Sequence, residues 1–145
     1  MKALLANWQV WAALSAMFAA LTAVFGKVGV ENIDSNFATL IRTVLILAVT
    51  AAIVVGLKSY QPLGEISGRT YIFLALSALA TGASWLCYYK ALQLGPAAGV
   101  AVLDKTSVIL VAVIAAVFLG ENLSALGWLG VVLMGAGAVL VGLKH

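Results

Sequence analysis

Five long apolar stretches, joined by short polar connections, dominate this sequence. They cover residues 8–26, 37–57, 70–92, 97–119 and 125–143. A helix needs about 20 apolar residues to cross the hydrocarbon core of a bilayer, so each stretch is long enough to span it. The chain has 145 residues, and five spans leave no room for a soluble domain. We therefore predict an all-α integral membrane protein, with residues 1–145 forming one bundle of five transmembrane helices.

The composition supports a membrane location and excludes several classes of protein. Charged residues make up 9% of the chain and hydrophobic residues 64%, whereas roughly 25% of the residues of a soluble domain are charged. This number of charges cannot cover a water-exposed surface. We therefore exclude a cytosolic domain, a nucleic-acid binder and a disordered tail. The bilayer is the first partner that the sequence predicts.

No arrangement of residues in the chain predicts an enzyme. The one cysteine, Cys87, excludes a disulfide framework and a cysteine-rich metal site. The one histidine, His145, is terminal, and no paired carboxylates lie within an apolar stretch. No glycine-rich phosphate loop follows a strand. We therefore expect no catalytic residues, no metal ligands and no cofactor.

Short polar signals mark the ends of the predicted helices. Ser35 is suited to cap the second span, because a serine hydroxyl accepts from the free N–H groups of a first helical turn. Gly95 and Pro96 end the third span and open the fourth. The residues 120–123 predict a tight turn, after which Ser124 can cap the fifth span.

Basic residues are divided almost evenly between the two faces of the membrane. Five spans put the termini on opposite sides, and lysines and arginines near the spans normally gather on the cytoplasmic side. Here they gather on neither, so the chain could insert in both orientations, or subtler signals could select one. The basic residues on the side of the N-terminus are Lys2, Lys58 and Arg69, and those towards the other side are Lys27, Arg42, Lys90 and Lys144.

Four ionisable residues inside the spans carry the strongest functional signal. Asp104 and Lys105 lie about eight residues into the fourth span, roughly 12 Å along the helix. Arg42 lies within the second span and Lys90 near the end of the third. Charges in a membrane helix are costly and usually face a cavity or a partner. All four fall in one half of the bilayer, which predicts a net positive vestibule for anionic or zwitterionic solutes.

A structural role for these four charges remains open. Asp104 could pair with Arg42 or Lys90, while the lysines extend towards the interface. Asp104 and Lys105 are neighbours and point about 100° apart on a helix, so we expect one to face the cavity and the other a neighbouring helix. Asp104 is also the candidate proton carrier if transport is coupled to protons.

Uncharged residues near these charges complete the candidate substrate site. Thr106 and Ser107 offer hydroxyls at the depth of Lys105, although both could equally bond back to their own helix. Trp85 lies deeper than Tyr88 and Tyr89 and could form a cavity wall. We interpret the two tyrosines as part of an interfacial aromatic belt.

Nearly the whole chain, and most firmly its second half, resembles the EamA domain of the drug/metabolite transporter superfamily. The resemblance is carried by the Leu119-Gly120-Glu121 turn with its glycine-rich last helix, by the Asp104-Lys105-x-Ser107 segment and by Arg42. It implies a transporter of small metabolites, often an exporter, in the cytoplasmic membrane. Typical members carry two inverted five-helix halves, and this chain supplies one half.

A single half implies a partner inserted upside down, because inverted-repeat transporters bind their substrate where the two halves meet. The partner would be a second copy, giving an antiparallel homodimer, or a related half-size chain. The weak charge bias agrees with an antiparallel homodimer. Amino acids and other anionic or zwitterionic solutes are the expected substrates.

Two other interpretations compete with this one. Small multidrug-resistance proteins also work as antiparallel dimers, but they have four helices and an acidic residue in the first, which this chain lacks. A non-transporting membrane subunit that anchors a larger complex is the other alternative. The charges inside the spans argue against a pure anchor, which has no use for them.

Overall fold

The computed structural model describes residues 7–143, and over these residues it is helical with short connections. Five segments are long and apolar enough to cross a membrane, which confirms the all-helical fold class. Lys2 and Lys144, two of the basic residues assigned above to the two faces of the membrane, lie outside the described residues. The long helices are α2 (Trp8–Gly29), α3 (Ser35–Gly56), α4 (Gly68–Leu94) and α7 (Ala125–Gly142), with a short 3₁₀ turn, η1 (Leu63–Glu65), before α4.

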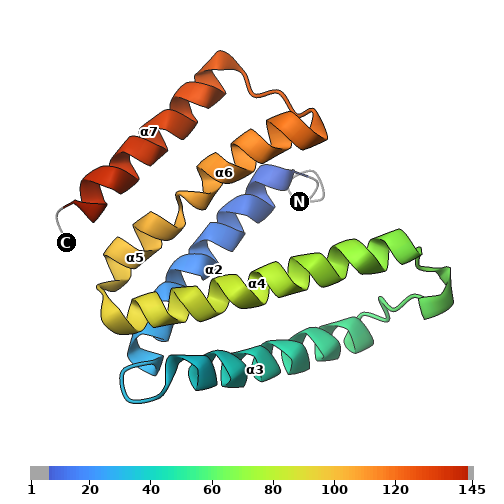
Figure 1. The fold of residues 1–145 in the computed structure, drawn as a ribbon. Helices are drawn as coiled ribbons and strands as arrows, with labels where there is room; N and C mark the ends of the chain where they lie inside the picture. The colour runs from blue at the N-terminus through green and yellow to red at the C-terminus, as the bar shows by residue number, and fades with distance from the viewer. Residues whose placement is uncertain (1–6, 144–145) are drawn as a thin grey trace. The chain divides into compact units, whose positions relative to one another are not determined.

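The fourth span is divided into three pieces rather than the one helix expected over residues 97–119. It consists of α5 (Ala97–Asp104), α6 (Ser107–Ile114) and a π-helical turn, η2 (Ala115–Leu119). Figure 1 shows the interruption between α5 and α6. Gly120 ends the span with a φ of 68°, a left-handed conformation that glycine adopts without strain.

The chain forms two compact units, one of which combines residues up to Phe25 with those from Gly95 onward, while the other is Gly26–Leu94. In the second unit α3 and α4 run antiparallel and pack together (Figure 1). Its buried residues gather where the end of α2 meets these two helices, and they are Val30, Ser35, Thr39, Tyr89 and Leu92.

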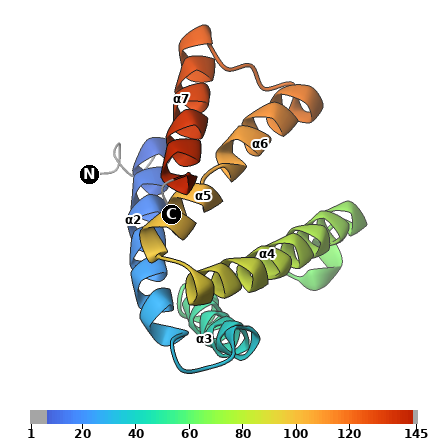
Figure 2. The same ribbon diagram turned by 60° about the vertical axis from the view of Figure 1, so that its left-hand side comes forward.

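In the other unit α7 packs against both α5 and α6. Figure 2 shows α7 beside α5 and diverging from α6 towards the loop that joins α6 and α7. Small residues permit this packing, because a side chain at Gly135 would meet Ile109 and one at Gly142 would meet Leu103. Glycine at such positions lets helix backbones approach closely where lipid supplies no hydrophobic drive.

The cap of α3 differs from the prediction. Asp34, not Ser35, is the N-cap, and its Oδ1 accepts from the N–H groups of Asn36 (2.9 Å) and Phe37 (3.1 Å). A carboxylate at this end also interacts favourably with the helix dipole, while Ser35 is buried as the first residue of the helix. The predicted cap of α7 is confirmed, since Ser124 Oγ accepts from the N–H of Gly127 at 3.1 Å.

Large apolar side chains of the described helices lie mostly on the outside of the two units. Examples are Phe118 and Leu79, which are 79% and 73% exposed. A soluble protein buries such side chains, whereas lipid solvates them. The helices therefore satisfy their backbone groups internally and present apolar side chains outward, as a bilayer requires.

Gly26 lies in close contact with the end of α4 and gives a stability prediction. A Cβ there would lie 3.2 Å from both Leu92 Cδ1 and Tyr89 Oη, so Gly26→Leu should overpack the contact and destabilise the protein by about 1–3 kcal/mol. Gly29→Leu is the matched control, because nothing lies within 4 Å of a Cβ at that position. Thermal unfolding of the two variants in the same detergent checks the difference, and equal melting temperatures would contradict it.

Candidate functional site

Arg42 lies against aromatic rings inside the membrane-spanning part of the second unit. It follows the start of α3 by seven residues, about 10.5 Å along the helix. Its guanidinium carbon is 4.1 Å from the centroid of the Trp85 ring and 5.3 Å from that of Tyr89. Trp85 and Tyr89 are four residues apart on α4 and so share one face of that helix. Cation–π attraction in a desolvated site contributes about 2 kcal/mol.

One nitrogen of this guanidinium is left without an acceptor. Arg42 Nη1 is buried and makes no hydrogen bond to any of the described residues. The aromatic rings hold the charge but cannot accept in the plane of the guanidinium, where its N–H groups point. Leaving a buried charged donor unsatisfied costs more than about 1–3 kcal/mol. A carboxylate, whose two oxygens match the guanidinium fork, is the acceptor best suited to this group.

A shallow, open patch runs along α3 from this arginine. Its lining residues recur every three or four positions and thus form one face of the helix. The exposed surface of the patch is almost entirely apolar. The residues are Arg42, Leu45, Ile46, Val49 and Thr50.

A hydrogen-bond network holds the connection from α2 to α3 against the end of α4. Lys27 Nζ donates to the carbonyl of Leu92 at 2.7 Å, and Gln93 Nε2 donates to the carbonyls of Ile33 (2.9 Å) and Val30 (3.4 Å). Lys90 Nζ donates to Gln93 Oε1 at 3.0 Å. Lys90 is therefore bound to Gln93, which in turn donates to carbonyls between α2 and α3.

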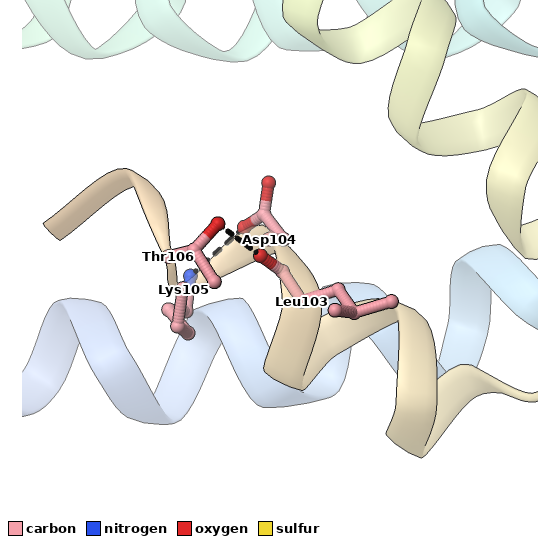
Figure 3. A network of polar contacts seen from close by, with 4 residues as sticks. All are labelled: Leu103, Asp104, Lys105 and Thr106. Atoms are coloured by element: carbon pink, nitrogen blue, oxygen red, sulfur yellow. Dashed lines mark hydrogen bonds and ion pairs between the residues drawn. The ribbon is translucent and has the colours of Figure 1, made fainter. Parts of the chain in front are cut away.

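The interruption of the fourth span lies at Lys105 and Thr106 (Figure 3). The N–H of Thr106 and its hydroxyl both donate to the carbonyl of Leu103, at 3.0 and 2.8 Å. In a continuous α-helix that carbonyl would accept from Ser107. The N–H of Val108 bonds three residues back, to Lys105, at 3.0 Å. A threonine side chain competing for the backbone thus accompanies a tightened turn of the kind that often marks a hinge.

Asp104 and Lys105 form an ion pair with each other, at 3.2 Å between Asp104 Oδ2 and Lys105 Nζ. Figure 3 shows the lysine side chain folded back towards the carboxylate. The two side chains were expected to point apart on a regular helix. The helix is interrupted after Asp104, so the side chains can meet. Asp104 does form an ion pair, as the structural alternative expects, but its partner is Lys105 rather than Arg42 or Lys90. Ser107 begins α6 beside this pair and is exposed.

This ion pair predicts a compensation between two substitutions. Asp104→Asn alone and Lys105→Met alone each leave a charge without its partner in an apolar setting, which is costly. We expect each single variant to lower the yield of folded protein, and the double variant to recover most of it. Size-exclusion chromatography of the four proteins measures the recovery. If the double variant accumulates no better than the worse single variant, the pair does not matter for folding.

The structure brings some of the predicted site residues together and assigns a new one. Arg42 and Trp85 meet in the second unit, and Asp104, Lys105 and Ser107 adjoin at the interruption in the other. The belt interpretation is wrong for Tyr89, which is 5% exposed and lies beneath Arg42. Tyr89 follows Trp85 by four residues, and this spacing indicates that both side chains lie on one face of α4.

Comparison with known proteins places the chain among transporters. The model of the EamA-like transporter family matches residues 6–143. A curated protein of Sinorhizobium sp, described as an uncharacterized transporter in the cobO 3' region, is 62% identical over 135 residues. The match covers 93% of this chain and 96% of that protein, so the relative has nearly the same length. No solved structure matches the chain.

Proposed function

The chain belongs to the EamA-like transporter family, and we propose that it moves small anionic or zwitterionic metabolites by alternating access, as an antiparallel homodimer in the cytoplasmic membrane. Membership in this family makes it a multi-pass membrane transporter and not an enzyme. The substrate class, the pairing and the particular membrane are the parts that we propose.

The observation that carries the substrate class is the guanidinium of Arg42. It is positive, lies against the rings of Trp85 and Tyr89 within a span, and carries a buried nitrogen that no described residue satisfies. Intramembrane charges of this kind usually mark substrate or ion pathways. The positive charge of this guanidinium favours amino acids and organic acids over cationic drugs.

The interrupted fourth span supports a moving part. Discontinuous transmembrane helices recur at the binding sites of secondary transporters. Here the turn at residues 105–106 joins two short helices, and the Asp104–Lys105 pair lies beside it. We propose that α5 and α6 change their mutual angle at this turn as access alternates, with Ser107 and the ion pair adjoining the solute path.

Three observations support the antiparallel pairing. The described residues hold five candidate spans, the number expected of one inverted repeat, and a relative of nearly the same length is also described as a transporter. The basic residues of this chain favour neither face of the membrane, as expected for a chain that inserts both ways. Two copies in opposite orientations would reproduce the symmetry that inverted-repeat transporters obtain from one longer chain.

The decisive experiment combines topology with reconstitution. Paired reporters fused after His145, one active only inside the cell and one only outside, should give comparable signals. The purified chain alone should then transport radiolabelled amino acids or organic acids into liposomes. Signal from one reporter, with transport only when a second half-size chain is added, would support a heterodimer. No transport with any partner would favour a non-transporting subunit.

A further inference from the structure

We propose that one face of the fourth span docks onto the same face of a second, antiparallel copy of this chain, so that Asp104 pairs with the partner's Lys105. The inference rests on the proposed function, because it names the surface through which the proposed homodimer forms. We call this surface the α6 face. It begins at the Asp104–Lys105 pair and continues along the exposed side chains of Ser107, Leu110, Val111, Ile114 and Phe118.

The α6 face is one side of its helix, opposite the side that packs on α7. Its members recur every three or four positions, which places them together on the helix surface. Ile109 follows Ser107 by two residues, about 200° around the helix, and lies against Gly135 of α7. Packing within the unit therefore uses one side of α6 and leaves the side with the α6 face exposed.

The ion pair at the beginning of this face is exposed although it lies within a span. The side chains of Lys105 and Asp104 are 55% and 36% exposed. Lipid solvates the apolar members of the α6 face, but charges in hydrocarbon are costly. Pairing lowers that cost without removing it, because both ions are still desolvated. A partner that brings charges of its own to this depth is therefore favoured over lipid.

Both groups of the ion pair can bind a second partner. Their bond joins Lys105 Nζ to Asp104 Oδ2, and it uses one of the three protons of the ammonium group. Neither side-chain group makes another hydrogen bond to a described residue. Asp104 Oδ1 and two ammonium protons thus remain available to opposite charges from a second chain.

An acid next to a base makes the α6 face complementary to itself. In a two-fold dimer, a residue that contacts a second position of the partner is itself matched by the reverse contact. Asp104 opposite the partner's Lys105 therefore brings Lys105 opposite the partner's Asp104. The four charges alternate in sign and sum to zero, so two copies satisfy each other without a third component.

The depth of the pair suits an antiparallel arrangement. Val108 is midway between Ala97 and Leu119, the ends of the fourth span, and the pair lies three to four residues from it, about 4.5–6 Å. A two-fold axis in the membrane plane puts the partner's pair equally far on the other side, about 10 Å away in depth. A lysine side chain of about 6 Å, an aspartate of about 2.5 Å and a bond of about 3 Å reach across this distance.

The test is a charge exchange between two full-length chains that carry different affinity tags. One chain carries Asp104→Lys and the other Lys105→Asp, so each has two like charges in place of the pair. We expect each variant alone to give about tenfold less dimer than the unaltered chain, because like charges would meet across the interface. Co-expression should restore a mixed dimer, measured by cross-linking in membranes and purification on both tags in succession.

Glu65→Lys and Arg69→Asp are the matched control for this exchange. They make the same two changes of charge at exposed positions just before α4 and at its start. We expect the two control chains to form mixed dimers and self-dimers equally. An equal preference for mixed dimers in the control would contradict the inference, because net charge alone would then explain the pairing.

Cross-linking with the charges intact decides the question if the altered chains do not accumulate. In a Cys87→Ser background, Leu110→Cys should give a covalent dimer with a thiol cross-linker of about 10 Å, the usual distance between packed helices. Leu79→Cys is the matched control, because Leu79 is also exposed and lies near the middle of α4. Phe118→Cys should not cross-link either, since it lies ten residues from Val108 and thus about 30 Å from its copy in an antiparallel pair.

Two results would overturn the inference. One is failure of co-expression to restore the dimer, as expected if the ion pair, or a different partner of Asp104, lies within a single chain. The other is a cross-link at Phe118→Cys as strong as that at Leu110→Cys, which would indicate a parallel pair. The proposed function is tested separately by the reporters and the liposomes. If both reporters are active and the purified chain transports, the antiparallel homodimer stands and only this interface is wrong.

Discussion

Arg42→Lys is expected to reduce transport about a hundredfold while leaving a folded protein. Truncating a charged group that pairs with a buried partner costs about 2–5 kcal/mol, and about 2.7 kcal/mol corresponds to a hundredfold. Lysine keeps the positive charge, so a purely electrostatic role would be largely preserved. It lacks the planar fork that binds both oxygens of a carboxylate and that stacks on Trp85 and Tyr89.

Arg69→Lys is the matched control for this experiment. Arg69 also lies over an aromatic ring, with its guanidinium carbon 5.7 Å from the centroid of Phe73, but at the beginning of α4 and outside the candidate site. Initial uptake rates in proteoliposomes with equal protein content compare the two variants. Retention of most activity in Arg42→Lys, or an equal loss in Arg69→Lys, would argue against carboxylate recognition by Arg42.

Thr106→Ala is expected to slow turnover about tenfold with little change in the apparent affinity for the solute. Alanine removes the hydroxyl that competes for the carbonyl of Leu103, and it is the best helix former. The fourth span should then be more continuous, and bending at the interruption should be less favourable. A cost of about 1.4 kcal/mol on that step corresponds to tenfold in rate.

Thr81→Ala provides the matched control for the hinge. Thr81 makes the same type of bond to its own helix, to the carbonyl of Ser77 at 2.8 Å, within the uninterrupted α4. Hydrogen exchange at residues 104–108 reports whether the interruption has become more regular. Slower exchange in Thr106→Ala with normal turnover would show that the interruption is not a hinge for transport.

The positions of the spans follow from the sequence because lipid imposes a simple rule. Twenty or so apolar residues must form a helix that satisfies its own backbone. The helix from Gly68 contains the whole predicted stretch 70–92, and the helix from Ser35 ends one residue before the end of the predicted stretch 37–57. The interruption at Thr106 was not predictable in this way. A threonine in an apolar run leaves the mean hydropathy of the run nearly unchanged. Its effect on the helix depends on the carbonyl to which its hydroxyl donates.

The candidate site was predictable in its charges but not in its contacts. Arg42 stands out in any reading because a charged residue within a span is costly. Which aromatic rings it meets depends on the packing of α3 on α4, and periodicity on a single helix does not specify that pairing. The sequence therefore predicts an interfacial Tyr89 and a partner for Asp104 on another helix, whereas Tyr89 is buried and Asp104 pairs with Lys105.

The division of the chain at Phe25 and Gly95 has a consequence for biosynthesis. Residues 26–94 form an uninterrupted segment whose closing contacts, from Lys27 to Leu92 and from Gln93 to Ile33, lie near its two ends. Chains emerge from the ribosome N-terminus first, so this segment can complete its contacts while the last two spans are still being made. Only the part of the first span up to Phe25 groups with residues from Gly95 onward, so that part acquires these neighbours after the rest of the chain has been synthesised.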